Sequence, residues 1–193
     1  MTGSKWSLRA PLAALLPLVL CACATPGARW NPPAVPALTP PPGRAGRHFD
    51  CNAPRGGSAH WFRPAPGKSL AISGALQIER FKDDPPRISN AYIDLVLAGG
   101  RTVNLTIEDL DKGMLGILLT DSTAPRAEHI VGTIPLYPRP VPFYLQLTAD
   151  SLLHVAVGDV RGSMQLADAR PVGVALACWS TRLYYSNVVV AAR

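Results

Sequence analysis

Charged residues are scarce in this chain, and its N-terminal apolar segment is too short to cross a membrane as a helix. Asp, Glu, Lys and Arg make up 17% of the 193 residues, whereas hydrophobic residues make up 48%. This balance excludes a wholly disordered chain and supplies the apolar surface for one domain with a core. The net charge is +6, but the basic residues are scattered, so binding of nucleic acid is not predicted.

The sequence also lacks the motifs of common catalytic and cofactor sites. It contains neither a phosphate-binding loop nor a dinucleotide fingerprint, and Ser58 does not lie in a Gly-x-Ser-x-Gly turn. The four histidines are far apart in the chain, and neither Cys51 nor Cys178 belongs to a Cys-x-x-Cys pair, so no metal site is predicted. These absences favour a protein that is not an enzyme and that requires no cofactor.

The N-terminal segment has an ordered set of recognisable parts. Two basic residues precede the apolar residues 11–20, and Ala22 and Cys23 follow them. This order resembles the signal peptide and lipobox of bacterial lipoproteins. The resemblance implies that residues 1–22 are removed, and that Cys23 becomes the first residue and carries the acyl chains that anchor the protein to a membrane.

Two alternatives to lipidation at Cys23 stay open. Cys21 is a second candidate acceptor, although Leu20 fits poorly where lipoprotein signals have a small residue. The other alternative is an ordinary secretory signal that ends at Ala22 or Ala24. No Asp follows Cys23. In the families that this segment resembles, Asp at that position favours the inner membrane, so the resemblance implies the outer membrane of the cell envelope, facing the periplasm.

The four cysteines have different expected fates. Cys21 leaves with the signal and Cys23 takes lipid, so Cys51 and Cys178 remain in an oxidising compartment. We predict that these two form a disulfide between the beginning and the end of the folded domain. Two separate buried thiols are the alternative. In the chain-entropy treatment, a bridge that closes a loop of over a hundred residues contributes roughly 4–5 kcal/mol.

Proline separates a linker from the folded part of the chain. Residues 23–47 contain the runs Asn31–Pro36 and Pro40–Gly43, which favour extended polyproline geometry, so we expect a semi-rigid, lipid-anchored linker. In residues 48–193, apolar and polar residues alternate with a period of two, most clearly in Arg101–Glu108. We therefore expect a single β domain there.

About ten segments of this domain have the character of strands. They are residues 70–79, 91–97, 101–108, 115–119, 129–134, 143–148, 153–157, 162–166, 172–178 and 183–190. Gly, Pro, Asp or Ser residues separate most of them. The pattern predicts an all-β, antiparallel β-sandwich or barrel, with a loop around Ser58 and His60.

Four segments of the C-terminal third resemble a known family. Phe143–Thr148, Leu152–Gly158, Pro171–Leu176 and Leu183–Val190 are similar to the closing strands of concanavalin A-like (laminin G-like) jelly-roll sandwiches. The resemblance implies a jelly-roll-like β-sandwich. Members of that family include lectins, glycan hydrolases and interaction modules, so the fold alone does not decide the function.

The carboxylates that serve the hydrolases of that family are missing. Their Glu-x-Asp-x-x-Glu motif does not occur. Glu108 and Asp109 are expected to lie in a solvated turn and not to share a site, because adjacent residues of a strand point to opposite faces. Asp83 and Asp84 could help to bind calcium, as in some jelly-roll domains of this type. A solvated loop is the alternative.

Residues 135–142 are the best candidate for a binding loop. Four prolines order this loop before any contact is made. Tyr137 could stack on a sugar or lie in an interface, and Arg139 could pair with an anion. A stiff connector between strands is the alternative. Other aromatic and histidine side chains are expected to pack in the core and at sheet edges (Trp61, Trp179, Tyr184 and Tyr185) or to face outward (His154).

These observations predict a non-catalytic lipoprotein of the cell envelope whose β-sandwich binds a glycan or a protein partner. A divergent glycan-active hydrolase of the jelly-roll class is one alternative, and a structural or assembly component of the outer membrane is another. The expected partners are the membrane, through the lipid anchor, and an envelope glycan or protein.

Overall fold

The computed structural model describes residues 47–81, 90–110, 113–123, 129–136 and 139–193. The predicted lipidation site Cys23, the residues Asp83 and Asp84, and Tyr137 of the candidate loop all lie outside the described residues. None of the helical structure in the described part is long and apolar enough to cross a membrane.

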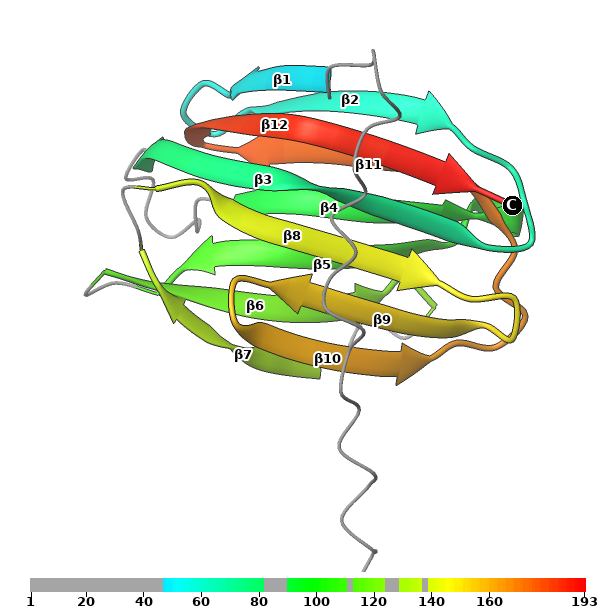
Figure 1. Ribbon diagram of the computed structural model, residues 1–193. Coiled ribbons are helices and arrows are strands. Elements are labelled where there is room, and N and C mark those ends of the chain that lie inside the picture. The colour runs from blue at the N-terminus through cyan, green and yellow to red at the C-terminus, as the bar shows by residue number, and fades with distance from the viewer. Residues whose placement is uncertain (1–46, 82–89, 111–112, 124–128, 137–138) are drawn as a thin grey trace, which may run out of the picture. The chain divides into compact units, whose positions relative to one another are not determined.

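The described chain forms a sandwich of two six-stranded sheets, in which every pair of neighbouring strands is antiparallel (Figure 1). Sheet A has the order β1 (Arg47–Asn52), β12 (Thr181–Ala192), β3 (Leu70–Phe81), β8 (Val141–Leu147), β9 (Leu152–Val157) and β10 (Val160–Gln165). Sheet B has the order β2 (Ser58–Pro64), β11 (Pro171–Trp179), β4 (Asn90–Leu97), β5 (Thr102–Asp109), β6 (Met114–Asp121) and β7 (His129–Pro135). The predicted all-β antiparallel sandwich is confirmed.

The core lies between the two sheets and follows the predicted alternation. The apolar residues of β4 and β5 that face it are at most 2% exposed: Ile93, Leu95, Leu97, Val103, Leu105 and Ile107. From sheet A, Tyr185 is fully buried and its ring meets Phe143 edge-to-face, with the centroids 6.0 Å apart. The Tyr185 hydroxyl lies 2.9 Å from the carbonyl oxygens of Tyr92 and Ala177, so burial leaves this polar group satisfied. Tyr185 is a core residue, as predicted.

Two strands, β1 and β2, were not predicted, so the sandwich has twelve strands and not about ten. β1 is largely polar, and Cys51 is its one buried residue. β2 exposes every second residue and includes Pro64. Each is an edge strand: β1 pairs with β12 and β2 pairs with β11. The predicted loop around Ser58 and His60 is therefore wrong, because pairing with a neighbouring strand outweighs weak local strand character.

The predicted disulfide is confirmed. Cys51 on β1 is bonded to Cys178 on β11, with their Cα atoms 6.1 Å apart and a separation of 127 positions in sequence. Both residues are fully buried. Because β1 belongs to sheet A and β11 to sheet B, the bridge joins the two sheets across the core near the edge where β1 lies by β2 (Figure 1).

An ion pair between Arg101 and Asp121 lies at the end of the β5–β6 hairpin opposite its turn. The Arg101 side chain donates to both carboxylate oxygens of Asp121, at 3.0 Å from Nε to Oδ1, and the backbone and hydroxyl of Thr123 donate to the same Oδ1. The side chains of Arg101 and Asp121 are only 16% and 13% exposed. The hydrogen bond from Arg101 is the main cause that lowers the pKa of Asp121 from 3.8 to about 2.

Replacing Asp121 with Asn is expected to lower the free energy of unfolding at pH 7 by about 1–2 kcal/mol, after allowance for screening by solvent. A lowered folded-state pKa gives stability that is present above about pH 4 and is lost as the pH falls through about 2. Urea denaturation at pH 7 and at pH 2 measures the difference. Asp159→Asn, at an exposed turn, is the control, and an equal loss at both pH values for Asp121→Asn would contradict the assignment.

Candidate functional site

The polar residues of β4 and β5 gather on the outer face of sheet B, away from the core. They occupy the positions between the buried residues of each strand. The pairing register sets Tyr92 opposite Thr106 and Asp94 opposite Asn104. Side chains directly opposite each other on one face lie within about 5.5 Å at Cβ. This arrangement makes one polar cluster from two strands.

A directed chain of hydrogen bonds runs through this cluster. The Thr106 hydroxyl donates to Oδ1 of Asn104, and Nδ2 of Asn104 donates to Oδ1 of Asp94 at 2.5 Å. The first bond fixes the orientation of the Asn104 amide, and the second holds the Asp94 carboxylate. Among the described residues, none donates a hydrogen bond to Oδ2 of Asp94. One carboxylate oxygen is therefore held and the other is available as an acceptor.

Asp94 is half-buried, and it lies on a face that carries little positive charge. Burial is the main cause that raises its pKa from 3.8 to about 6, against the opposing effect of the Asn104 hydrogen bond. In the described part of the chain, no Lys or Arg projects from the outer face of sheet B. An ionised carboxylate in this position destabilises the fold, which is characteristic of residues kept for a function.

Aromatic side chains flank the cluster. Tyr92 is next to Asp94 on the same face, and its hydroxyl accepts a hydrogen bond of 2.8 Å from Nδ2 of Asn90, so the hydroxyl proton is left to donate elsewhere. On β11, Trp179 lies opposite Asn90. Trp179 alternates with the core residue Cys178 and so belongs to the outer face of sheet B. The sequence had predicted packing in the core or at a sheet edge.

A third aromatic residue, Phe62 of the edge strand β2, is 48% exposed and lies over Gly173 of β11. A Cβ atom at Gly173 would be 2.6 Å from the Phe62 ring, so only glycine allows this ring position. Between Phe62 and Asp94, β11 contributes the small side chain of Ala175. The face thus offers apolar rings on β2, β4 and β11 beside the polar cluster.

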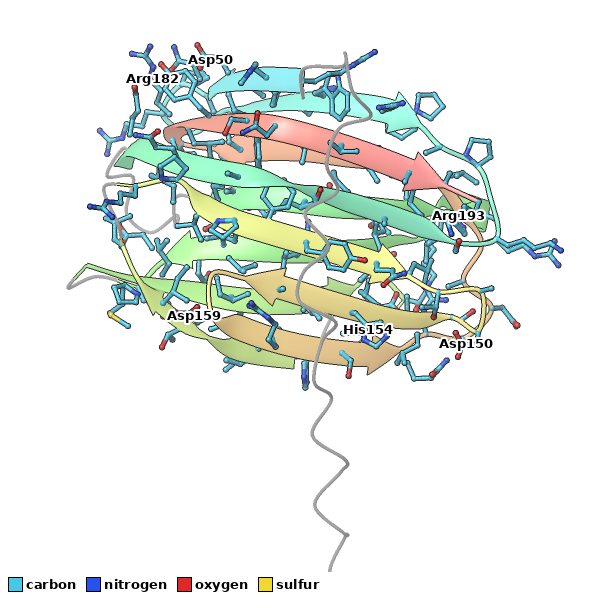
Figure 2. The ribbon with its side chains drawn as sticks, viewed as in Figure 1. Asp50, Asp150, His154, Asp159, Arg182 and Arg193 are labelled. Atoms are coloured by element: carbon cyan, nitrogen blue, oxygen red, sulfur yellow. A yellow bond between two sulfur atoms is a disulfide. The ribbon has the colours of Figure 1, made fainter. Side chains whose placement is uncertain are left out.

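The residues predicted from the sequence to bind a ligand do not belong to this cluster. Arg139 is exposed in the connection between β7 and β8, and Tyr137 lies outside the described residues. Glu108 and Asp109 lie at the end of strand β5 and point to opposite faces, so they do not share a site, as predicted. Both are half-buried, so the expectation of a solvated turn is wrong. His154 lies on the outer face of sheet A, as predicted, on β9 opposite Gln146 and Ser163 (Figure 2).

Sequence reasoning missed Asp94 and Asn104, although two signals were present. Both occupy polar positions that alternate with apolar ones in the predicted strands 91–97 and 101–108, and those apolar positions are buried. Both are also equally distant in sequence from Gly99, which has a φ of 76° in the turn η1 (Ala98–Gly100). A tight turn centred there pairs residues at equal distances on either side. The polar phase together with the turn would have placed them opposite each other.

No group of three or more His, Cys, Asp or Glu side chains that could hold a metal ion occurs in the described ranges. The cluster of Asp94, Asn104 and Thr106 is instead made of hydrogen-bonding groups. It can accept and donate hydrogen bonds to a ligand with hydroxyl or amine groups while a flat ligand surface stacks on the neighbouring rings.

No protein-family model matches this chain, and no curated protein is similar to it. Among solved structures, the chain is similar to the Crh5 transglycosylase in complex with NAG (TM-score 0.54, 11% identity, covering 74% of this chain and 71% of that one). It is also similar to an alginate lyase from Pseudomonas aeruginosa (TM-score 0.51, 14% identity, covering 68% and 69%). A carbohydrate-binding module from Bacillus subtilis has a TM-score of 0.47 at 8% identity, covering 77% and 97%. At these identities the likeness shows the fold, a jelly-roll-like β-sandwich.

Proposed function

We propose that this protein is a non-catalytic, glycan-binding lipoprotein of the cell envelope, and that its ligand lies on the outer face of sheet B. The observation that carries the proposal is the chain of hydrogen bonds from Thr106 through Asn104 to Asp94. That chain holds a carboxylate in one orientation with one oxygen available. Sugar hydroxyls need such fixed acceptors, and sugar rings stack on aromatic side chains. The jelly-roll-like folds of a transglycosylase and an alginate lyase support the glycan as a ligand class.

The spacing of carboxylates supports binding over hydrolysis. Glu108 is the other carboxylate on this face among the described residues, and it pairs with Asn90 at the other end of β4. At about 3.4 Å per residue, the four residues between the positions of Glu108 and Asp94 correspond to about 14 Å along the strands. Glycosidases hold their two carboxyl groups about 5–9.5 Å apart. Within the described ranges, Asp94 therefore lacks the second carboxylate that glycoside hydrolysis uses.

Replacing Asn104 with Ala is expected to weaken glycan binding 10- to 100-fold, because it removes the donor that holds Asp94 in place. Titration calorimetry of the purified protein with soluble fragments of peptidoglycan, lipopolysaccharide and acidic polysaccharides measures the change. Gln146→Ala, at a half-buried position on the outer face of sheet A, is the matched control. Equal weakening by both variants would locate the ligand elsewhere. Release of shorter glycan products by the unmodified protein, lost in Asp94→Asn, would instead establish an enzyme.

The proposed anchor gives a separate prediction. Cys23→Ser is expected to move the protein from the membrane fraction to the soluble periplasmic fraction, because the acyl chains would have no sulfur to attach to. Cell fractionation followed by immunoblotting measures this. Cys21→Ser is the control and is expected to leave the protein in the membrane, since that residue would be removed with the signal. Membrane retention of Cys23→Ser would count against lipidation there.

A further inference from the structure

The outer face of sheet B lacks positive charge. The whole chain carries a net charge of +6, part of it in the N-terminal segment that is predicted to be removed. In its described part, however, Lys and Arg residues are absent from this face, and the charged groups there are the carboxylates of Asp94 and Glu108. The outer face of sheet A differs, since Arg182 projects there from β12 and pairs with Glu79 at 3.1 Å (Figure 2). Among the described residues, the outer face of sheet B therefore lacks cations, whereas that of sheet A carries them.

A positively charged ligand is the kind that most stabilises the ionised form of a half-buried carboxylate on a face without cations. Such a ligand replaces lost hydration with a charge-assisted hydrogen bond, which is roughly twice as strong as a neutral one. The free Oδ2 of Asp94 is the acceptor, and Asn104 already holds Oδ1. The adjacent ring of Tyr92 adds attraction for a cation, since ammonium groups are drawn to aromatic faces.

We infer that the glycan bound on this face carries a free amine: an amino sugar whose protonated amine meets Asp94 while its ring lies along Tyr92, with a further sugar of the same chain reaching Trp179, which lies opposite Asn90. This inference rests on the proposed glycan-binding function and narrows its ligand class. An N-acetylated sugar has a neutral amide in place of the ammonium and leaves the charge of Asp94 unbalanced. An acidic glycan would be repelled by Asp94 and Glu108.

The polar groups around Asp94 suit a sugar better than a metal ion. The described residues contain no group of three ligands for a metal. The Tyr92 hydroxyl, which accepts from Asn90, has its proton left for a ligand oxygen. Thr120 of β6 lies opposite Asn104, so Asp94, Asn104 and Thr120 form a line across three neighbouring strands. The hydrogen-bond donors and acceptors along this line suit the hydroxyl groups of a sugar chain.

The test compares three hexasaccharides of equal length on the processed full-length protein at pH 6.5, where both the sugar amines and Asp94 carry charge: one of glucosamine, one of N-acetylglucosamine and one of glucose. Titration calorimetry is expected to show at least tenfold tighter binding of the glucosamine hexamer than of the other two. Asp94→Asn, which keeps the shape of the side chain, is expected to remove that preference. Asp50→Asn, which removes the same charge from the outer face of sheet A, is expected to keep it.

A second measurement separates recognition of the amine from a structural effect. The sugar amines also gain protons as the pH falls, so the readout is the ratio of the affinities of the unmodified protein and Asp94→Asn for the glucosamine hexamer. The advantage of the unmodified protein over Asp94→Asn is expected to fall about tenfold between pH 7 and pH 5 as Asp94 takes up a proton. The other titratable groups on this face, among the described residues, are Tyr92 on β4, Glu108 on β5 and His60 on β2. β11 and the described β6 contribute none. A His60→Gln variant shows whether that residue contributes to the change.

The possible outcomes distinguish the two proposals. Equal or tighter binding of the acetylated or neutral hexamer, or an unchanged preference in Asp94→Asn, overturns the inference and leaves glycan binding intact. Absence of binding by all three hexamers and by the envelope polysaccharides overturns both. Binding of a lysine-containing peptide at the same affinity as the glucosamine hexamer, and equally dependent on Asp94, would show that the face recognises ammonium groups without regard to sugar, and so overturns the assignment to an amino sugar.

Discussion

Replacing Cys51 and Cys178 together with Ala is expected to lower the free energy of unfolding by about 5 kcal/mol. The bridge joins residues 127 apart in sequence, so its loss restores a large amount of conformational freedom to the unfolded chain. Native domains have a free energy of unfolding of about 5–15 kcal/mol. The doubly substituted protein is therefore expected to be partly unfolded at 37 °C.

The location of the bridge predicts where unfolding begins without it. β1 is an edge strand whose pairing is with β12 alone among the described strands, and the Cys51 sulfur is its covalent link to sheet B. In the disulfide-free protein, β1 is expected to lose protection from hydrogen exchange before β3 and β8, which lie inside sheet A.

Urea denaturation, with and without the two cysteines, measures the loss in stability. Both proteins should carry Cys23→Ser, so that neither lipid nor a third thiol affects the result. Hydrogen exchange followed by mass spectrometry locates the first region to open. A loss below about 2 kcal/mol would mean that residual structure in the unfolded chain reduces the conformational entropy lost on closing the loop, and would contradict the predicted effect.

Replacing Asp94 with Asn is expected to raise the free energy of unfolding above pH 7 by about 3 kcal/mol, because it removes a buried charge. Burial raises the pKa of Asp94 from 3.8 to about 6. The folded state therefore binds a proton more tightly than the unfolded state, and ionisation of Asp94 destabilises the fold. This cost is absent below about pH 4, grows as the pH rises to about 6, and is constant above that.

The expected pH profile is specific to this residue. At pH 4 the unmodified protein and Asp94→Asn should have nearly equal stability, because Asp94 is then protonated and the amide of the variant resembles the neutral carboxyl group in shape and hydrogen bonding. At pH 8 the variant should be more stable. Thermal unfolding at several pH values between 4 and 8 measures the difference, with Asp50→Asn as the control for net charge. A stability difference that does not change with pH would contradict the raised pKa of Asp94.

A stabilising substitution at the centre of the proposed binding face would also clarify the binding experiments. If Asp94→Asn is more stable at pH 6.5 and loses the preference for an amine, unfolding cannot explain the loss. A residue that lowers the stability of the fold is expected in a ligand site when binding requires that side chain.

The amino-acid sequence by itself determined the fold class and the core. Each sheet buries one face, so residues that face the core are apolar, whereas their neighbours along the strand can be polar. Apolar residues therefore recur at every second position of a strand. Ile93 and Leu95 occupy apolar positions of this alternation in the predicted strand 91–97, and both are fully buried. The disulfide followed from the small number of cysteines and their expected compartment, and Cys51 and Cys178 do pair.

Only the tertiary structure decided which strands form the edges and where the polar residues meet. β1 and β2 become strands because β12 and β11 offer them partners, and no local pattern reports a partner that is distant in sequence. Burial in the folded sheet raises the pKa of Asp94, and the hydrogen bond from Asn104 on the neighbouring strand β5 opposes that rise. Register and burial depend on contacts between distant segments, so the chemistry of this face belongs to the folded state and not to any one segment.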